Sequence, residues 1–231
     1  MTLPTSLLAI LTLALGVNAH FRLVQPIWRG SSFEEPASQW IYPCANVNET
    51  TSASNRTLWP TTGGSLMING SHTHALTSVN LALGSNATNF NITLVEMFNQ
   101  TGAGMFCLKE TGRANLEEGF KAAGYSGMED ERIEGLMASV QVIQLGHSGS
   151  ALYNCADIMF NSTAQLLADD QCQNSTGVGG VAIQNADVNS TPGGPTSSGS
   201  AAPAASSAAA SVFTPAVGSG LLAAMLACGL L

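Results

Sequence analysis

The segment SVQVIQLGHSGSALYNCADIMF, residues 139–160, decides the fold class. Its first part, Ser139–Gln144, alternates apolar and polar side chains, and its second part, Ala151–Phe160, is another apolar run. The Gly-rich connection Gly146–Gly149 between the two runs is typical of a β-hairpin turn. We therefore predict two neighbouring antiparallel strands here.

The sequence upstream of this hairpin favours further strands and one helix. Short alternating runs occur at Ser65–Asn69, Ser78–Leu83 and Phe90–Met97. The segment Asn115–Ala123 has helical spacing, with its apolar side chains on one side, and Gly124 is placed to end it. Many short strands with Gly and Asn turns predict an all-β sandwich with this helix in a long loop.

The charge balance excludes one class of function. The 231 residues contain seven Lys and Arg against fifteen Asp and Glu, a net charge of −8. A nucleic-acid-binding protein needs a basic face. We therefore expect no nucleic-acid partner.

Both ends of the chain are typical of processing signals. Residues 1–19 resemble a secretory signal peptide, with a short apolar run and small residues before the cleavage position. Residues 212–231 form an apolar tail typical of a glycosylphosphatidylinositol (GPI) signal, with the attachment site near 197–207. A single membrane span is the alternative, although this tail is short and broken by Gly.

Composition divides the remaining chain. The predicted domain is 20–173, and 174–211 is predicted to be a disordered stalk of small and polar residues. We expect the mature protein on the extracellular face of the plasma membrane or in the cell wall. Nine N-x-[ST] sequons agree with a secreted chain. They start at Asn48, Asn55, Asn69, Asn86, Asn91, Asn99, Asn161, Asn174 and Asn189.

Four cysteines remain once the tail is removed, namely Cys44, Cys107, Cys155 and Cys172. An even number in a secreted domain predicts two disulfides, and the residues alone leave three connectivities open. None of the spacings is that of a zinc motif.

Cleavage after Ala19 would make His20 the first residue of the mature chain. Its α-amine and imidazole could then chelate one metal, and nitrogen ligands suit Cu(II). A second imidazole would complete a T-shaped histidine brace, and both His72 and His74 are candidates. The competing interpretation is that these two lie in a polar turn and face solvent.

Asp157 is the third candidate ligand. An acid in the middle of a strand is costly to bury without a partner, and a metal ion is one such partner. An exposed position on an edge strand is the alternative interpretation.

Several of these features together resemble one family. They are His20-Phe21, Pro26 with Arg29-Gly30, a histidine just before a strand, and the Tyr-x-Cys-Ala-Asp-Ile run ending at Ile158. The chain resembles the copper-binding family of fungal GPI-anchored surface proteins similar to lytic polysaccharide monooxygenases (LPMOs), the copper-acquisition-factor group.

The resemblance implies an immunoglobulin-like or fibronectin-III-like β-sandwich with two disulfides. It implies a copper site of His20, His74 and Asp157, with His72 as the alternative to His74. On the same resemblance we predict the pairs Cys44–Cys155 and Cys107–Cys172.

The expected function is Cu(II) binding that supports copper acquisition or homeostasis. A carboxylate ligand would favour Cu(II) over Cu(I), which suits holding copper and disfavours O2 activation, so catalysis is not expected. The GPI lipid would attach the protein to the membrane, near a plasma-membrane copper importer as candidate partner. The alternatives are a copper-dependent monooxygenase acting on cell-wall glycans and a metal-free structural mannoprotein.

Overall fold

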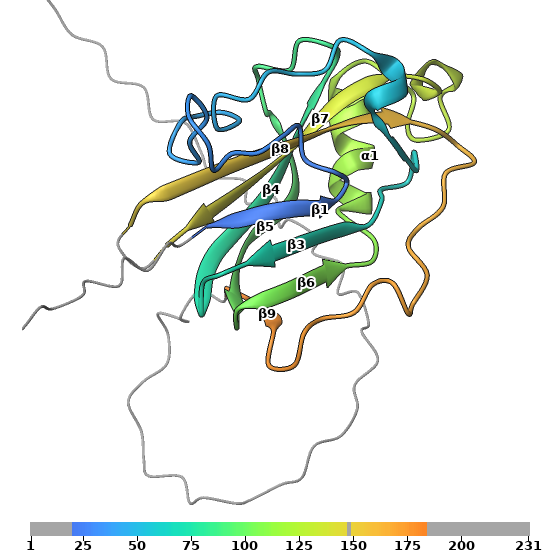
Figure 1. Ribbon diagram of the computed structural model, residues 1–231. Coiled ribbons are helices and arrows are strands. Elements are labelled where there is room, and N and C mark those ends of the chain that lie inside the picture. Colours follow the sequence, from blue (N-terminus) through green and yellow to red (C-terminus); the bar gives the residue numbers. More distant parts are fainter. Residues whose placement is uncertain (1–19, 147–148, 184–231) are drawn as a thin grey trace, which may run out of the picture. The chain divides into compact units, whose positions relative to one another are not determined.

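The computed structural model describes residues 20–146 and 149–183, which form a two-layer β-sandwich (Figure 1). One sheet has three strands in the order β1-β3-β6, and the other has six in the order β2-β8-β7-β4-β5-β9. Side chains from both sheets form one buried core. The predicted all-β sandwich is therefore confirmed.

The strands of the smaller sheet are β1 (Phe21–Gln25), β3 (Leu66–Gly70) and β6 (Gly104–Leu108). Those of the larger sheet are β2 (Thr57–Trp59), β4 (His74–Leu83), β5 (Ile92–Thr101), β7 (Met137–Leu145), β8 (Ala151–Phe160) and β9 (Gly179–Ala182). The α-helix is α1 (Arg113–Ala122), and two 3-10 turns span Ala53–Asn55 and Glu131–Ile133. All neighbouring strands are antiparallel except β2 and β8.

The predicted hairpin is present as β7 and β8. Gln144 lies opposite Leu152, and the Gly146 N–H donates to the Ser150 carbonyl at 3.1 Å. Val140 and Val142 are buried, as the alternation indicated. Residues 147 and 148 of the turn lie outside the described residues.

Strand β4 starts at His74, four positions before the predicted Ser78. Sequence reasoning placed the start late because Thr77 breaks the apolar alternation. In the structure Thr77 is buried, and its hydroxyl donates to Gln100 Oε1 at 3.4 Å. A partnered hydroxyl can be buried without a large penalty, so the strand continues through this position.

The folded chain extends beyond the predicted domain boundary at residue 173. The Cys107 N–H donates to Asn174 Oδ1 at 2.8 Å, and β9 pairs with β5. The composition of this segment suggested the stalk because it offers few large side chains. Backbone hydrogen bonds hold it instead. The rest of the predicted stalk, the predicted signal peptide and the predicted GPI tail lie outside the described residues.

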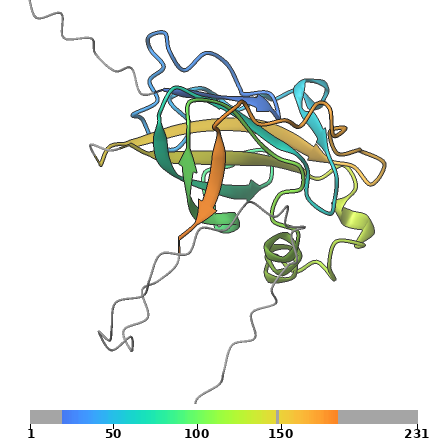
Figure 2. The same ribbon diagram turned by 90° about the horizontal axis from the view of Figure 1, so that it is seen from below.

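Helix α1 packs on β5 in the loop between β6 and β7 (Figure 1), and Figure 2 views it along its axis. Leu116 and Phe120 are fully buried, as their spacing predicted. Gly124, two positions after the last helical residue, has φ +89°. This left-handed conformation suits glycine and helps to end the helix.

The loop after α1 contains a short-range ion pair. Arg132 Nη2 lies 2.6 Å from Asp130 Oδ2, and the Ser126 N–H also donates to this carboxylate at 2.8 Å. The Arg132 guanidinium, together with these N–H donors, holds the pKa of Asp130 well below its usual range.

Two disulfides connect distant parts of the sandwich. Cys44–Cys155 ties the long loop between β1 and β2 to β8, and Cys107–Cys172 ties β6 to the segment before β9. These are the two pairs that the family resemblance implied. Within residues 20–146 and 149–183, no helix has the length and apolar character needed to cross a bilayer.

Candidate metal centre

His20 lies directly before β1 and is held by Ser71, the residue that follows β3. The Ser71 N–H and hydroxyl both donate to the His20 carbonyl at 2.9 Å. The His20 N–H in turn donates to Ser71 Oγ at 2.9 Å. A peptide nitrogen thus stands at the end of the sandwich, at the position where cleavage after Ala19 would create an α-amine.

The His20 imidazole borders an open pocket of about 490 Å³. Its ring meets the ring of Phe33 edge-on, with centroids 5.4 Å apart. Phe33 is itself half exposed, and Asn69 and Ser71 of the β3 side complete the wall. The imidazole is therefore accessible from solvent.

The other two described histidines lie close to Ser71 along the chain. His72 belongs to the turn that connects β3 to β4, and His74 is the first residue of β4. With Cα atoms 3.8 Å apart along the chain, His74 lies no more than about 11 Å from Ser71. The structure thus brings the segments that carry His20, His72 and His74 to one end of the sandwich.

The two candidate second histidines differ in orientation. In β4 the neighbouring Ala75 is fully buried, so alternation places His74 on the outer face of the six-stranded sheet, where it is exposed. His72 instead approaches β7, because a Cβ atom on Gly146 would lie 3.3 Å from its Cε1 atom. His72 thus contacts the end of the β7–β8 hairpin, whereas His74 faces outward from the sheet.

Asp157 does not join this end. Asp157 lies opposite Ser139, and Ser139 lies opposite Ala82, eight positions after His74 in β4. At about 3.3 Å per residue, the strand direction separates the levels of His74 and Asp157 by roughly 26 Å. The three predicted ligands are thus not brought together.

The carboxylate of Asp157 has three protein partners. Its Oδ1 accepts from Arg29 Nε at 2.8 Å and from Ser139 Oγ at 2.7 Å, and its Oδ2 accepts from the Thr50 N–H at 2.8 Å. Asp157 is only 4% exposed. Burial of this charge is therefore compensated by an ion pair and two further hydrogen bonds.

A second ion pair continues this buried cluster. Glu49 Oε1 lies 2.8 Å from Arg56 Nη2, and Glu49 Oε2 lies 3.7 Å from Arg29 Nη2. Arg56 Nη1 also donates to the Ala138 carbonyl at 3.0 Å. The cluster holds the long loop between β1 and β2 onto the larger sheet, beside Cys44–Cys155.

Sequence reasoning missed this pairing although both partners were in the resembling motifs. The sequence did contain a signal for this pair, namely the scarcity of cationic side chains. The chain has only seven Lys and Arg, and Arg29 is one of them. A strand acid flanked by apolar residues needs a cation, and a rare Arg in an otherwise apolar segment is the natural candidate.

The donor set therefore fits copper only in part. The nitrogen atoms of His20 and one further imidazole are ligands that Cu(II) accepts, whereas Asp157 is committed to Arg29. In the part of the chain that the structure describes, no group of three His, Cys, Asp or Glu side chains is placed to hold a metal. A brace needs only two such side chains, because the amine supplies the third nitrogen.

Comparisons with known proteins agree with a copper-related role. A family model described as copper acquisition factor BIM1-like matches residues 18–177. An uncharacterized protein of Aspergillus fumigatus is 35% identical over 173 residues, which are 74% of this chain and 65% of that protein. This chain thus spans slightly less than two thirds of that relative's length.

Two further relatives carry LPMO-like names. The lytic polysaccharide monooxygenase-like protein ham-7 of Neurospora crassa is 30% identical over 210 residues, 80% of this chain and 84% of that protein. The lytic polysaccharide monooxygenase-like protein X325 of Hypocrea jecorina is 28% identical over 201 residues, 75% and 79% of the two chains. The fold, the match over residues 18–177 and these relatives together show that the chain belongs to the BIM1-like copper acquisition factor family of LPMO-like proteins.

Proposed function

We propose that this protein binds Cu(II) at the cell surface, where a GPI lipid anchors it, and supports copper acquisition or homeostasis without cleaving polysaccharides. The observation that carries the proposal is the position of His20. Its backbone nitrogen donates to Ser71 at the end of the sandwich. Ser71 is one residue before His72 and three residues before His74 in the sequence. The family match supports the copper-related part of the proposal.

The proposed ligands are the α-amine and imidazole of His20, with a second imidazole from His74 or His72. The sequence predicted His74, whereas the inward approach of His72 to Gly146 favours His72. An α-amine has a pKa near ~8, so Cu(II) can displace its proton at neutral pH. Asp157 is left out of this donor set because Arg29, Ser139 and Thr50 occupy its oxygens.

The proposal is tested by Cu(II) titration followed by electron paramagnetic resonance (EPR). The mature chain, beginning at His20, is compared with a variant that carries one extra residue before His20. His20→Ala, again with a free amine, is the second comparison. We expect one tightly bound Cu(II) in the mature chain, with nitrogen hyperfine structure, and a loss of this species in both variants.

Equal and weak binding by all three forms would overturn the copper proposal and favour the metal-free mannoprotein. The location is tested separately. Treatment of intact cells with a GPI-specific phospholipase should release the protein. Retention on the cells after that treatment would contradict the anchor without affecting the copper site.

A copper monooxygenase acting on cell-wall glycans is the second candidate, and one observation favours it. Phe33, Trp40 and Tyr42, all in the loop between β1 and β2, expose about half of their surface each. Exposed aromatic side chains that gather in one loop mark interaction surfaces. Copper-loaded protein with a reductant and peroxide should release no oxidised oligosaccharides, and their release would establish this alternative.

One of the two arguments for copper acquisition over oxidative catalysis is removed by the structure. The expected carboxylate ligand was the argument against oxygen activation, and Asp157 contacts Arg29 instead. The family description is what still favours acquisition over oxidation.

A further inference from the structure

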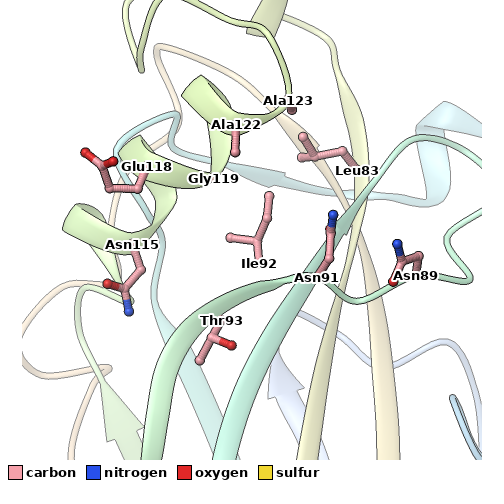
Figure 3. Close-up of a pocket in the computed structure, with 10 residues that line it drawn as sticks. All are labelled: Leu83, Asn89, Asn91, Ile92, Thr93, Asn115, Glu118, Gly119, Ala122 and Ala123. Carbon is pink, nitrogen blue, oxygen red and sulfur yellow. The ribbon is translucent and has the colours of Figure 1, made fainter. Parts of the chain in front are cut away.

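A cleft of about 500 Å³ lies between α1 and the start of β5 (Figure 3). This volume falls in the range of about 300–1,000 Å³ that is usual for small-molecule sites. One part of its lining is small or apolar and another part is polar. The lining residues are Leu83, Asn89, Asn91, Ile92, Thr93, Asn115, Glu118, Gly119, Ala122 and Ala123.

The cleft contains a complete glycosylation sequon in its own wall. Asn91, Ile92 and Thr93 form N-x-T. Asn91 directly precedes β5, and both Asn91 and Thr93 are exposed. Ile92, between them, is buried and packs against Gly119 of α1. In Figure 3 the side-chain amide of Asn91 extends into the cleft, toward Leu83.

Three other sequons in or beside strands are less accessible than Asn91. Asn69 in β3 is half-buried. Asn99 is half-buried and its Oδ1 atom is sequestered from solvent. Asn161 follows β8 and donates its Nδ2, the atom that would carry a sugar, to Glu134 at 2.6 Å. Asn91 combines an exposed amide with a cleft beside it.

We propose that Asn91 carries an N-linked glycan whose first N-acetylglucosamine lies in this cleft against α1. The proposal rests on the secretory route assumed in the proposed function, but on no part of the copper site. The donor is a lipid-linked oligosaccharide diphosphate. The bond from its anomeric carbon to the phosphate oxygen breaks, a bond to Asn91 Nδ2 forms, the amide gives up one proton, and the lipid diphosphate leaves.

The lining matches the two sides of such a sugar. The ring carries an apolar C–H face, which Leu83, Ala122 and Ala123 can cover. Its hydroxyl and acetamido groups need hydrogen-bond partners, which Asn115 and Glu118, on the same helix as Ala122, offer. The small side chains of α1 leave the space that the sugar would fill.

Helix α1 has few other sources of stability at its exposed side. Its ten residues are too few for an isolated helix to be stable in water, and its N-cap residue Gly112 provides no side-chain cap. Leu116 and Phe120 anchor one side in the core. A sugar on Ala122 and Ala123 would cover the exposed last turn.

The test uses the full chain secreted from a eukaryotic host that adds high-mannose glycans. Glycopeptide mass spectrometry measures occupancy at every sequon. Hydrogen exchange over residues 113–123 is then compared in three forms: the intact glycoprotein, protein trimmed by an endoglycosidase to one N-acetylglucosamine, and Asn91→Gln. Asn86→Gln is the matched control, because it removes a sequon of the preceding loop that does not line the cleft.

We expect Asn91 to be occupied, and the intact and trimmed forms to exchange equally slowly. Asn91→Gln should exchange about fourfold faster or more, since burial of even one methylene-sized group changes an equilibrium by about that factor. Thr93→Ser, which keeps the acceptor, should behave as the intact form.

Two results would overturn the inference while leaving the secretory route intact. One is an unmodified Asn91 in protein that is glycosylated at other sequons, and the other is equal exchange in trimmed protein and Asn91→Gln. A chain with no occupied sequon at all would overturn the inference together with the secretory route. Loss of copper binding alone would leave it untouched.

Discussion

Substitution of Asp157 by Asn separates a structural carboxylate from a copper ligand. In the structure Asp157 pairs with Arg29, whose side chain is only 6% exposed. Asp157→Asn keeps the size of the side chain but leaves the buried Arg29 guanidinium with only the more distant Glu49 carboxylate, 3.7 Å from its Nη2. Removal of one partner of a buried ion pair costs about 3–5 kcal/mol, because the remaining charge loses its nearest counter-charge.

The expected loss of stability is large for a domain of this size. A domain of 150–250 residues loses about 2–4 °C in Tm per kcal/mol, so Asp157→Asn should lower Tm by roughly 6–20 °C. Ser139→Ala removes one neutral donor from the same carboxylate and should cost only about 1–2 kcal/mol. This milder variant keeps the measurement available if Asp157→Asn does not fold.

Urea denaturation gives the stability of each variant, and Cu(II) titration of the mature chain gives the affinity. We expect lower stability in both variants and a Cu(II) affinity within twofold of the parent, because Asp157 is remote from His74. Arg29→Gln combined with Asp157→Asn should be less destabilised than the sum of the two single variants. A tenfold loss of Cu(II) affinity in the Ser139→Ala or Asp157→Asn variant, with unchanged stability, would refute this reasoning.

Three further outcomes are expected. His72→Ala should abolish the brace spectrum in EPR while His74→Ala keeps it, and the reverse result would favour the sequence-based choice of His74. Asp130→Asn should destabilise the protein at pH 7, because the lowered pKa of Asp130 stabilises the fold above the ordinary carboxyl pKa of about 4. The difference in stability from the parent should shrink as the pH falls below that value. A difference in urea midpoints that does not change with pH would contradict this prediction. Replacement of Cys107 and Cys172 by Ser should lower the free energy of unfolding by about 4 kcal/mol, since the disulfide closes a loop with a sequence separation of 65. An unchanged Tm would show that this disulfide does not stabilise the fold.

Several elements could be predicted because their signals are local. The β7–β8 hairpin follows from alternation on both sides of a Gly-rich turn, and α1 from the spacing of Leu116 and Phe120. The short strands β1, β6 and β9 could not be predicted in the same way. β3 is equally short, yet its apolar run at Ser65–Asn69 was predicted, whereas pairing with a distant strand is what holds these three.

Of the predicted copper ligands, the structure brings the histidine segments together but not Asp157. His20 and the His72–His74 segment do meet at one end of the sandwich, because Ser71 bonds the backbone of His20. Asp157 had the right neighbours in the sequence for a family motif, and the register of β7 and β8 places it elsewhere.

The sequence by itself determined the secondary structure of the hairpin and helix, the family and the candidate histidines. These depend on side-chain patterns within a few residues of one another. Only the tertiary structure decided which partner each buried charge receives. Arg29 reaches Asp157 across 128 positions of sequence, and no local spacing encodes that pair. A buried carboxylate must be compensated by some cation, and the packing of the loop onto β8 determines that the cation is Arg29.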